Sequence, residues 1–235
     1  MTDRRAVLLC AGRGTRARGI TEGQPKCLIQ VGGRTLLSRM LSQLIANGVD
    51  DVHVVVGYEA DQILKEVGDR ATLHYYEGFE RTNNLWTLAA NADLLRGRDC
   101  AVLFGDVIVS DQAVADLWSG LRGVNLLVDQ TSRLAGTMRV RRAGDGVVEM
   151  GNHIAPAESD GNYVGLMTVR AGASDALADA VREEMLAGRG QDAYFTTVIE
   201  GISASVPVSF VDVASGSWAE IDDGDDYLLA KQRFE

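Results

Sequence analysis

The alternation of short apolar runs with amphipathic helical patterns through residues 4–106 constrains the fold more than any other feature of the sequence. Apolar runs of strand length occupy residues 5–10, 50–57, 71–77 and 100–106, and helical patterns occupy residues 36–48, 60–68 and 82–97. Strands that alternate with helices form parallel sheets whose faces the helices cover. The sequence therefore predicts an α/β, Rossmann-like fold with a mostly parallel mixed sheet flanked by helices.

The second half of the chain is richer in strands. Candidate strands lie at 124–129, 137–143, 146–151, 163–171 and 206–213, and helical patterns lie at 174–188 and 223–234. We expect a strand-rich insert around residues 125–170 that handles a second ligand. No repeat, linker or low-complexity segment divides the chain. The sequence predicts a single domain over 1–235, made of the halves 1–124 and 125–235.

Charge is distributed unevenly along this acidic chain, whose net charge is −10. Residues 1–39 contain eight basic and two acidic residues, so this segment carries +6 and the remaining 196 residues carry −16. The acidic total argues against general nucleic-acid binding, which needs a basic face. A basic amino-terminal segment suits a compact anion such as a nucleoside triphosphate, although an accidental exposed cluster is the simpler alternative.

Cysteine spacing and hydropathy exclude several other classes. The three cysteines have no paired spacing that predicts a zinc site or a disulfide framework. No apolar run approaches the roughly 20 residues of a membrane helix, and no signal-peptide core follows Met1. We therefore expect a cytoplasmic protein without a membrane partner.

A glycine-rich loop, AGRGTRARGITEGQPK, follows the first apolar run directly. Gly12 and Gly14 let the backbone approach a ligand closely, and their N–H groups can form a concave anion site. Cationic side chains accompany them at Arg13, Arg16, Arg18 and Lys26. The coincidence of strand, paired glycines and cations predicts a phosphate-binding loop, with a flexible surface loop as the alternative.

The string GRGTRA also satisfies the dinucleotide-binding fingerprint. That fingerprint requires a helix from the second glycine and an acidic residue about 20 positions later. Gly19, Gly23 and Pro25 instead keep the chain irregular until about Thr35, and the acidic residue is missing. A P-loop is excluded because the lysine lacks its required spacing from the glycines.

Carboxylates follow strands in two distant segments. Asp106 ends the run AVLFGD, at the edge of the sheet where ligands of such folds bind. Glu220 and Asp222 lie two apart in SWAEID, and this spacing places both side chains on one face of a strand. Taken singly, Asp106 and Asp222 are typical of turn or helix-cap residues. Together with a triphosphate loop they predict a Mg²⁺ site.

The strings LCAGRGTR and QPKCLIQVGGRTLL closely resemble the signature of the nucleotidyltransferase family that includes the sugar-nucleotide pyrophosphorylases. The chain departs from that signature at Cys10, at the segment ARGI and at Gly33–Arg34. The resemblance implies that Asp106 and Asp222, with Glu220 as a third candidate, bind the metal. It implies nucleotide-binding and catalytic roles for a further set of residues: Leu9, Ala11 and Gly12 at the base and sugar, Gly14, Thr15 and Arg16 at the β- and γ-phosphates, and Lys26 at the α-phosphate.

The string TNNLWTLAA and the ending SGSWAEIDDGDDYLLA are similar to the small phosphocholine and phosphonate cytidylyltransferases, and this likeness implies CTP as the nucleotide. Asn83, Asn84 and Thr87 fall at a predicted helix start. Asparagine amides both donate and accept, as recognition of a base edge requires. Capping by Asn83 is the structural alternative, and it is compatible with Asn84 reaching the ligand.

The acceptor pocket is expected in the second half. Arg139 and Arg141 share a strand face and could meet an anionic acceptor, although an exposed basic strand explains them equally well. Tyr163, Tyr194 and Trp218 are further candidates, with the core as their alternative location. A choline cation needs an aromatic cage, and residues 130–142 contain no aromatic residue.

The expected activity is transfer of CMP from CTP to a small phosphorylated or phosphonate acceptor, with release of pyrophosphate and Mg²⁺ as cofactor. Residues 1–124 would bind the nucleotide, and residues 125–235 would bind the acceptor and complete the metal site. Two alternatives stay open: a sugar-1-phosphate uridylyl-, thymidylyl- or guanylyltransferase, and a regulatory subunit that binds nucleotide without turnover. A homodimer is also left open.

Overall fold

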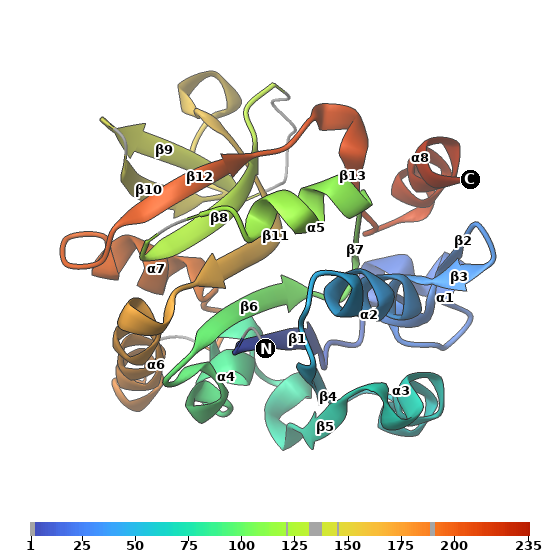
Figure 1. Cartoon of the computed structure of the whole chain (residues 1–235). Coiled ribbons are helices and arrows are strands. Elements are labelled where there is room, and N and C mark those ends of the chain that lie inside the picture. Colours follow the sequence, from blue (N-terminus) through green and yellow to red (C-terminus); the bar gives the residue numbers. More distant parts are fainter. Residues whose placement is uncertain (1–2, 121, 132–137, 145, 189–190) are drawn as a thin grey trace.

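The computed structural model describes residues 3–120, 122–131, 138–144, 146–188 and 191–235, which form layers of helices around one large sheet (Figure 1). The strands are β1 (Arg4–Cys10), β2 (Gln30–Val31), β3 (Arg34–Thr35), β4 (Asp51–Val56), β5 (Thr72–Tyr75), β6 (Asp99–Phe104), β7 (Val107–Val109), β8 (Val124–Asp129), β9 (Arg139–Ala143), β10 (Gly146–Gly151), β11 (Gly161–Val169), β12 (Val208–Asp212) and β13 (Trp218–Glu220). The α-helices are α1 (Arg18–Thr21), α2 (Leu36–Ala46), α3 (Ala60–Val67), α4 (Asn84–Ala89), α5 (Asp111–Leu117), α6 (Ala171–Leu186), α7 (Thr196–Ile202) and α8 (Gly224–Phe234). Within these ranges no helix is long and apolar enough to cross a membrane.

Four parallel strands, in the order β6-β1-β4-β5, form the first half of the sheet. The chain adds β4 and β5 on one side of β1 and then crosses to place β6 on the other side. The order of the strands therefore reverses between β1 and β6. In open α/β sheets, ligands bind at the carboxyl ends of the strands at such a switch point. The fold thus places the glycine-rich loop, which follows β1, beside the segment that follows β6.

Alternation along the strands separates two apolar cores. Ala6 and Leu8 of β1 face a core that α2, α3 and α5 complete, whereas Val7 faces a core that α4, α6 and α7 complete. Side chains of successive strand residues point to opposite faces, so a strand covered on both sides must be apolar throughout. This is why RAVLLC forms a central strand, and it confirms the predicted α/β sheet with helices on both faces.

The strands of the second half extend the same sheet, antiparallel except for β12, which pairs parallel with β8. β11 pairs antiparallel with β6, β8 and β9, and a register shift between Tyr163 and Met167 bends it. Gly165 lies inside this bend with φ +88°, a conformation that glycine adopts without the penalty other residues incur. The strand-rich segment predicted around 125–170 is therefore a continuation of the sheet on the far side of β6.

One helix prediction needs correction. The pattern at 82–97 predicts a continuous helix, but α4 ends at Ala89 and the chain then makes a separate 3₁₀ turn at residues 92–95. The side chain of Asn91 donates from Nδ2 to the carbonyl of Thr87 at 2.9 Å. Asparagine side chains compete with the helix for backbone groups in this way, which favours the break.

A small two-stranded sheet brings the segment that follows β6 next to the segment that precedes α8. β13 pairs antiparallel with β7, with Glu220 opposite Val107 and Trp218 opposite Val109. Ile108, Ala219 and Ile221 bury their side chains in a third apolar cluster that includes Ala230 of α8. This packing carries the segment 220–222 next to Asp106.

Candidate functional site

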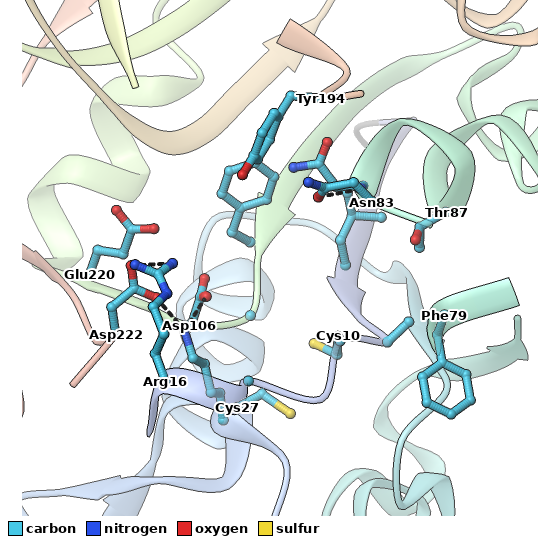
Figure 2. Close-up of a pocket in the computed structure, with 18 of the residues that line it drawn as sticks. Cys10, Arg16, Cys27, Phe79, Asn83, Thr87, Asp106, Tyr194, Glu220 and Asp222 are labelled. Carbon is cyan, nitrogen blue, oxygen red and sulfur yellow. Dashed lines mark hydrogen bonds and ion pairs between the residues drawn. The ribbon is translucent and has the colours of Figure 1, made fainter. Parts of the chain in front are cut away.

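A polar cleft of about 270 Å³ lies at the carboxyl ends of β1 and β6. Figure 2 shows side chains from both halves of the chain converging on it. Its lining residues come from the glycine-rich loop, the segment around α4, the ends of β6 and β13, and the segment before α7: Leu9, Cys10, Ala11, Gly12, Gly14, Arg16, Lys26, Cys27, Phe79, Thr82, Asn83, Asn84, Thr87, Phe104, Gly105, Asp106, Tyr194, Glu220 and Asp222.

Lys26 joins the two carboxylate segments. Its Nζ lies 3.2 Å from Asp106 Oδ2 and also forms an ion pair with Asp222 Oδ1. The lysine side chain is only 12% exposed. Burial acts to lower its pKa, but the charges and hydrogen bonds of Asp106 and Asp222 outweigh burial, so the pKa of Lys26 is raised above its ordinary value. Lys26 therefore carries a fixed positive charge at the centre of the cleft.

Arg16 approaches the same carboxylate from the loop. Its Nη2 lies 2.8 Å from Asp222 Oδ2, while its side chain is 74% exposed. Both oxygens of Asp222 are thus paired with cations. An exposed guanidinium is free to change partners at low cost, because an exposed ion pair contributes little stability. Arg16 is placed where it could also contact a phosphate group.

Asp106, Glu220 and Asp222 form a cluster of carboxylates, with one oxygen from each lying within 4.8 Å of the other two. The pairing of β7 with β13 produces this arrangement, and the N–H of Ile221 donates to the carbonyl of Asp106 at 2.9 Å. Burial first, and then the charges of Asp106 and Asp222, raise the pKa of Glu220 to about 8. Carboxylates held this close favour a bound cation, and oxygen donors of this kind suit Mg²⁺.

The backbone of the loop is shaped around Lys26. Gly14 has φ +59°, and a Cβ at this position would lie 2.6 Å from Lys26 Cγ. The helical segment α1 that follows is only four residues long. A dinucleotide-binding fingerprint would instead continue into a long helix here, so the structure supports the rejection of that alternative. The side chain of Arg18 lies outside the described part of the chain.

Asn83 and Asn84 have different roles at the start of α4. Asn83 caps the helix: its Oδ1 accepts from the N–H of Asn84 at 2.7 Å, and its Nδ2 donates to the carbonyl of Asp192 at 3.3 Å. Asn84 Oδ1 accepts from the N–H of Phe195 at 2.9 Å, which fixes the orientation of its amide. Asn84 and the buried Thr87 both line the cleft, as the nucleotide-binding prediction requires.

Among the predicted acceptor residues, the structure brings Tyr194 to the cleft, where its ring stands between Glu220 and Asn83 (Figure 2). The other four, Arg139, Arg141, Tyr163 and Trp218, do not line this cleft. Arg139 is buried and donates to the carbonyls of Asn152 and Ile154, since a buried guanidinium needs acceptors.

The other three are held elsewhere for equally local reasons. Arg141 is exposed and paired with Glu149, its partner across β9 and β10. Tyr163 packs in the core against Phe104, with ring centroids 6.1 Å apart. Trp218 Nε1 donates to Asp129 Oδ2 at 2.9 Å beneath the small sheet.

Thr15, predicted at the phosphates, is exposed at the start of the 3₁₀ turn 15–17 and lies outside the lining of the cleft. Residues 132–137, part of the segment 130–142 used in the choline argument, lie outside the described residues.

Sequence reasoning missed several lining residues. Gly105 and Phe104 immediately precede Asp106, so the end of β6 was a signal that could have found them. Cys10 lies between the predicted residues Leu9 and Ala11, but the sequence marks it only as a departure from the family signature. Phe79 and Thr82 lie in an irregular segment after β5, where no local pattern marks them.

The sheet order, the loop after β1 and the lysine–carboxylate cluster together define an α/β domain of the nucleotidyltransferase type. The chain belongs to the MobA-like NTP transferase domain family, whose pattern matches residues 6–187. The match covers both strands, β1 and β6, whose ends form the cleft.

Among proteins of known structure, the CTP:phosphocholine cytidylyltransferase of Streptococcus pneumoniae is similar in fold, with a TM-score of 0.84, 19% identity and coverage of 99% of this chain and 100% of that one. The bifunctional protein GlmU of Methanococcus maripaludis is 31% identical over 106 residues, which are 45% of this chain and 25% of that protein. The 2-aminoethylphosphonate cytidylyltransferase of Lancefieldella rimae is 30% identical over 111 residues, which are 46% of this chain and 45% of that protein. The chain therefore aligns with a quarter to a half of the length of these two relatives.

Proposed function

We propose that this protein transfers a CMP group from CTP to a small phosphorylated or phosphonate acceptor and releases pyrophosphate. The observation that carries the proposal is the position of Lys26, which pairs with Asp106 and Asp222 inside the cleft that Gly14 and Arg16 line. Positive and negative groups at one point suit a reaction between two anions. The cations would hold phosphate oxygens, and the carboxylates would hold a divalent cation.

In the proposed reaction an oxygen of the acceptor attacks the α-phosphorus of the nucleotide in line, and pyrophosphate leaves. The acceptor oxygen is already ionised near neutral pH, so the reaction needs no general base. Lys26 would neutralise charge at the α-phosphate. Arg16 would break its ion pair with Asp222 and contact the β- and γ-phosphates instead. Catalysis then consists of positioning and charge neutralisation.

Asp106, Asp222 and Glu220 would hold Mg²⁺. Their oxygens are close enough to share one ion, and hard oxygen donors are the ligands that Mg²⁺ prefers. When bound, the ion supplies positive charge that aligns the triphosphate and stabilises the charge developing on the leaving group. Asp106 precedes Glu220 and Asp222 by more than 100 residues in sequence, so only the folded chain brings these three oxygen donors together.

CTP is favoured by the likeness to proteins named as cytidylyltransferases. The acceptor is proposed to carry an ammonium group beside its phosphate or phosphonate. Tyr194 is 40% exposed in the cleft, and Phe104 also lines it, so the aromatic surface that a cation needs comes from outside residues 130–142.

A pyrophosphate-release screen tests the proposal. Each of four NTPs is combined with phosphocholine, aminoethylphosphonate, hydroxyethylphosphonate and sugar 1-phosphates, with Mg²⁺ and with a chelator. We expect release with CTP and an ammonium-bearing acceptor, and loss of release with the chelator. Preference for a sugar 1-phosphate would select the sugar-nucleotide alternative. Nucleotide binding without release in any combination would select the regulatory alternative.

Paired variants test the carboxylates in the same assay. Asp106→Asn and Asp222→Asn should each abolish Mg²⁺-dependent release, because each removes a donor and a charge. Asp225→Asn is the matched control, since Asp225 is exposed in the first turn of α8 and outside the cleft lining. Unchanged release in both site variants would contradict the proposed metal site.

A further inference from the structure

The loop between β1 and Lys26 is anchored on one side by apolar packing. It begins after Cys10, the last residue of β1, and ends at Pro25, before the 3₁₀ turn at residues 26–28. Ala17 is 1% exposed, Thr21 is buried, and Ile20 packs against the apolar cluster that contains Ala230 of α8. The loop therefore has a firm base on the α8 side, and its other side faces the connection between β4 and α3.

Tyr58, in that connection, hydrogen-bonds to both ends of the loop. Its backbone N–H donates to the carbonyl of Ala11 at 3.1 Å. Its hydroxyl donates to the carbonyl of Gly23, also at 3.1 Å. These two carbonyls are separated by the whole glycine-rich segment, including Gly14 and Arg16. A single residue thus spans the two stems of the loop.

The ring of Tyr58 makes a third contact with the loop. The guanidinium of Arg13 lies 5.2 Å from the centroid of this ring, within the range of a cation–π interaction. Arg13 Nη1 also lies 3.7 Å from Glu80 Oε1, in a pair whose side chains are both more than half exposed. The ion pair is weak on its own, so the ring gives Arg13 a second contact that favours one orientation.

We infer that Tyr58 is a positioning residue that clamps the glycine-rich loop in the conformation that binds the nucleotide. Tyr58 lies outside the cleft lining, so it acts through the loop. Without the clamp the loop would sample more conformations, and a ligand would have to select the competent one, which lowers its apparent affinity. The role in nucleotide binding rests on the proposed function, whereas the clamping of the loop does not.

The position of Lys26 makes it possible to distinguish a clamp on the glycine-rich loop from a general structural role of Tyr58. It lies beyond the returning stem and is held by Asp106 and Asp222, which Tyr58 does not contact. Loosening the loop should therefore weaken nucleotide binding while leaving the reacting groups in place. We expect loss of Tyr58 to raise the KM for the nucleotide much more than it lowers kcat.

The clamp is tested first by hydrogen–deuterium exchange of peptides covering residues 11–25, without ligand. Tyr58→Phe removes the hydroxyl bond to Gly23 and keeps the ring, so exchange should rise about fivefold, as expected for one net hydrogen bond. Tyr58→Leu removes the ring as well and should give a larger increase. Tyr75→Leu is the control, because Tyr75 is 61% exposed on β5. Unchanged exchange in Tyr58→Leu, or an equal rise in the control, overturns the clamp.

Nucleotide binding is then measured for the same variants by equilibrium dialysis with labelled CTP, and KM and kcat by pyrophosphate release. A several-fold rise in the dissociation constant and in KM, graded from Tyr58→Phe to Tyr58→Leu, supports the positioning role. A loosened loop with unchanged affinity overturns that role. If the loop loosens but even the unmodified protein binds no nucleotide, the clamp stands and the proposed function falls.

Discussion

Lys26 is the residue on which both the local charge balance and the proposed chemistry depend. Lys26→Met keeps most of the apolar stem and removes the charge, so pyrophosphate release should fall about 100- to 1000-fold, as when one preorganised charge-stabilising donor is lost. Lys65→Met is the control, because Lys65 is exposed on α3. Circular dichroism should show that both variants stay folded. A Lys26→Met protein with normal turnover would contradict the assignment.

Gly14 provides an independent test of the loop's shape. An alanine Cβ there would lie 2.6 Å from Lys26 Cγ, and the backbone φ of +59° is one that side chains disfavour. Gly14→Ala should therefore displace the Lys26 stem and reduce turnover about 5- to 30-fold, the effect of about 1–2 kcal/mol of left-handed strain. Gly19→Ala is the matched control, since no atom lies within 4 Å of its added Cβ. Turnover and thermal midpoints of both variants check this prediction.

Charged residues that lie at a strand end or in a specific motif were predictable from the sequence. Residues chosen only for their side-chain type were not. Lys26, Asp106 and Asp222 were found because strand ends, a glycine pair and a specific signature agreed. Arg139 was proposed only because an arginine could meet an anion, and it instead satisfies backbone carbonyls inside the protein. Which of two arginines on a strand is buried depends on neighbours distant in sequence.

Among the secondary-structure elements, the first turn of α8 connects stability with the proposed metal site. Asp223 Oδ1 accepts from the N–H groups of Asp225 at 3.0 Å and Asp226 at 3.1 Å, and Asp226 Oδ2 accepts from the N–H of Asp222 at 2.9 Å. Asp223→Ala removes the cap and should lower the free energy of unfolding by about 1 kcal/mol. It should also weaken Mg²⁺-dependent turnover, because the uncapped first turn holds Asp226, and therefore its hydrogen bond to the N–H of Asp222, less firmly.

Urea denaturation measures the cap, with Asp225→Ala as the control. The side chain of Asp225 is not part of the capping box, so its removal should have a smaller effect. Equal destabilisation by the two substitutions would show that general acidity in the first turn, rather than the cap, stabilises α8.

Local periodicity predicted most helices and long strands, but the short β7 gave no signal. Three residues, Val107–Val109, form a strand only because Trp218–Glu220 lies beside them. That pairing joins segments more than 100 residues apart, so no local pattern contains it. The same pairing assembles the carboxylate cluster. The sequence therefore predicted the three carboxylates as a group, and the pairing of β7 with β13 shows how the folded chain brings them together.

For the whole molecule, the most specific expectation concerns acid sensitivity. His53 on β4 and His74 on β5 lie with Nδ1 and Nε2 2.9 Å apart, and His53 Nε2 is 2.9 Å from Asp51 Oδ1. Arg5 and Arg98 also pair with Asp51, so the cluster contains both signs of charge. No local sequence pattern predicts a role for these histidines, since their contact depends on the pairing of β4 with β5.

Burial lowers the pKa of His53, against the opposing effect of Asp51, and Arg5 and His74 lower it further. Burial and then Arg5 also lower the pKa of His74. At these two histidines the unfolded chain, in which histidine titrates near pH 6.5, therefore binds more protons than the folded protein. The raised pKa of Glu220 acts in the opposite direction over the same pH range. The contribution of the two histidines to stability should be fully present above pH 7 and should be lost as the pH falls through about 6.5. Asp51 affects stability in a different, more acidic pH range, because the pKa of its carboxyl group is lowered.

Urea midpoints at pH 7.5 and pH 5.5 test this expectation. The change in midpoint from pH 7.5 to pH 5.5 should be more destabilising in the unmodified protein than in His74→Gln, because the variant retains one of the two titrating rings. His153→Gln is the control, since His153 is an exposed residue paired with Glu149 and far in sequence from the cluster. A pH dependence that persists fully in His74→Gln but disappears in His153→Gln would place the acid-sensitive group outside the β4–β5 pair, because only the variant that removes the responsible ring can flatten the difference.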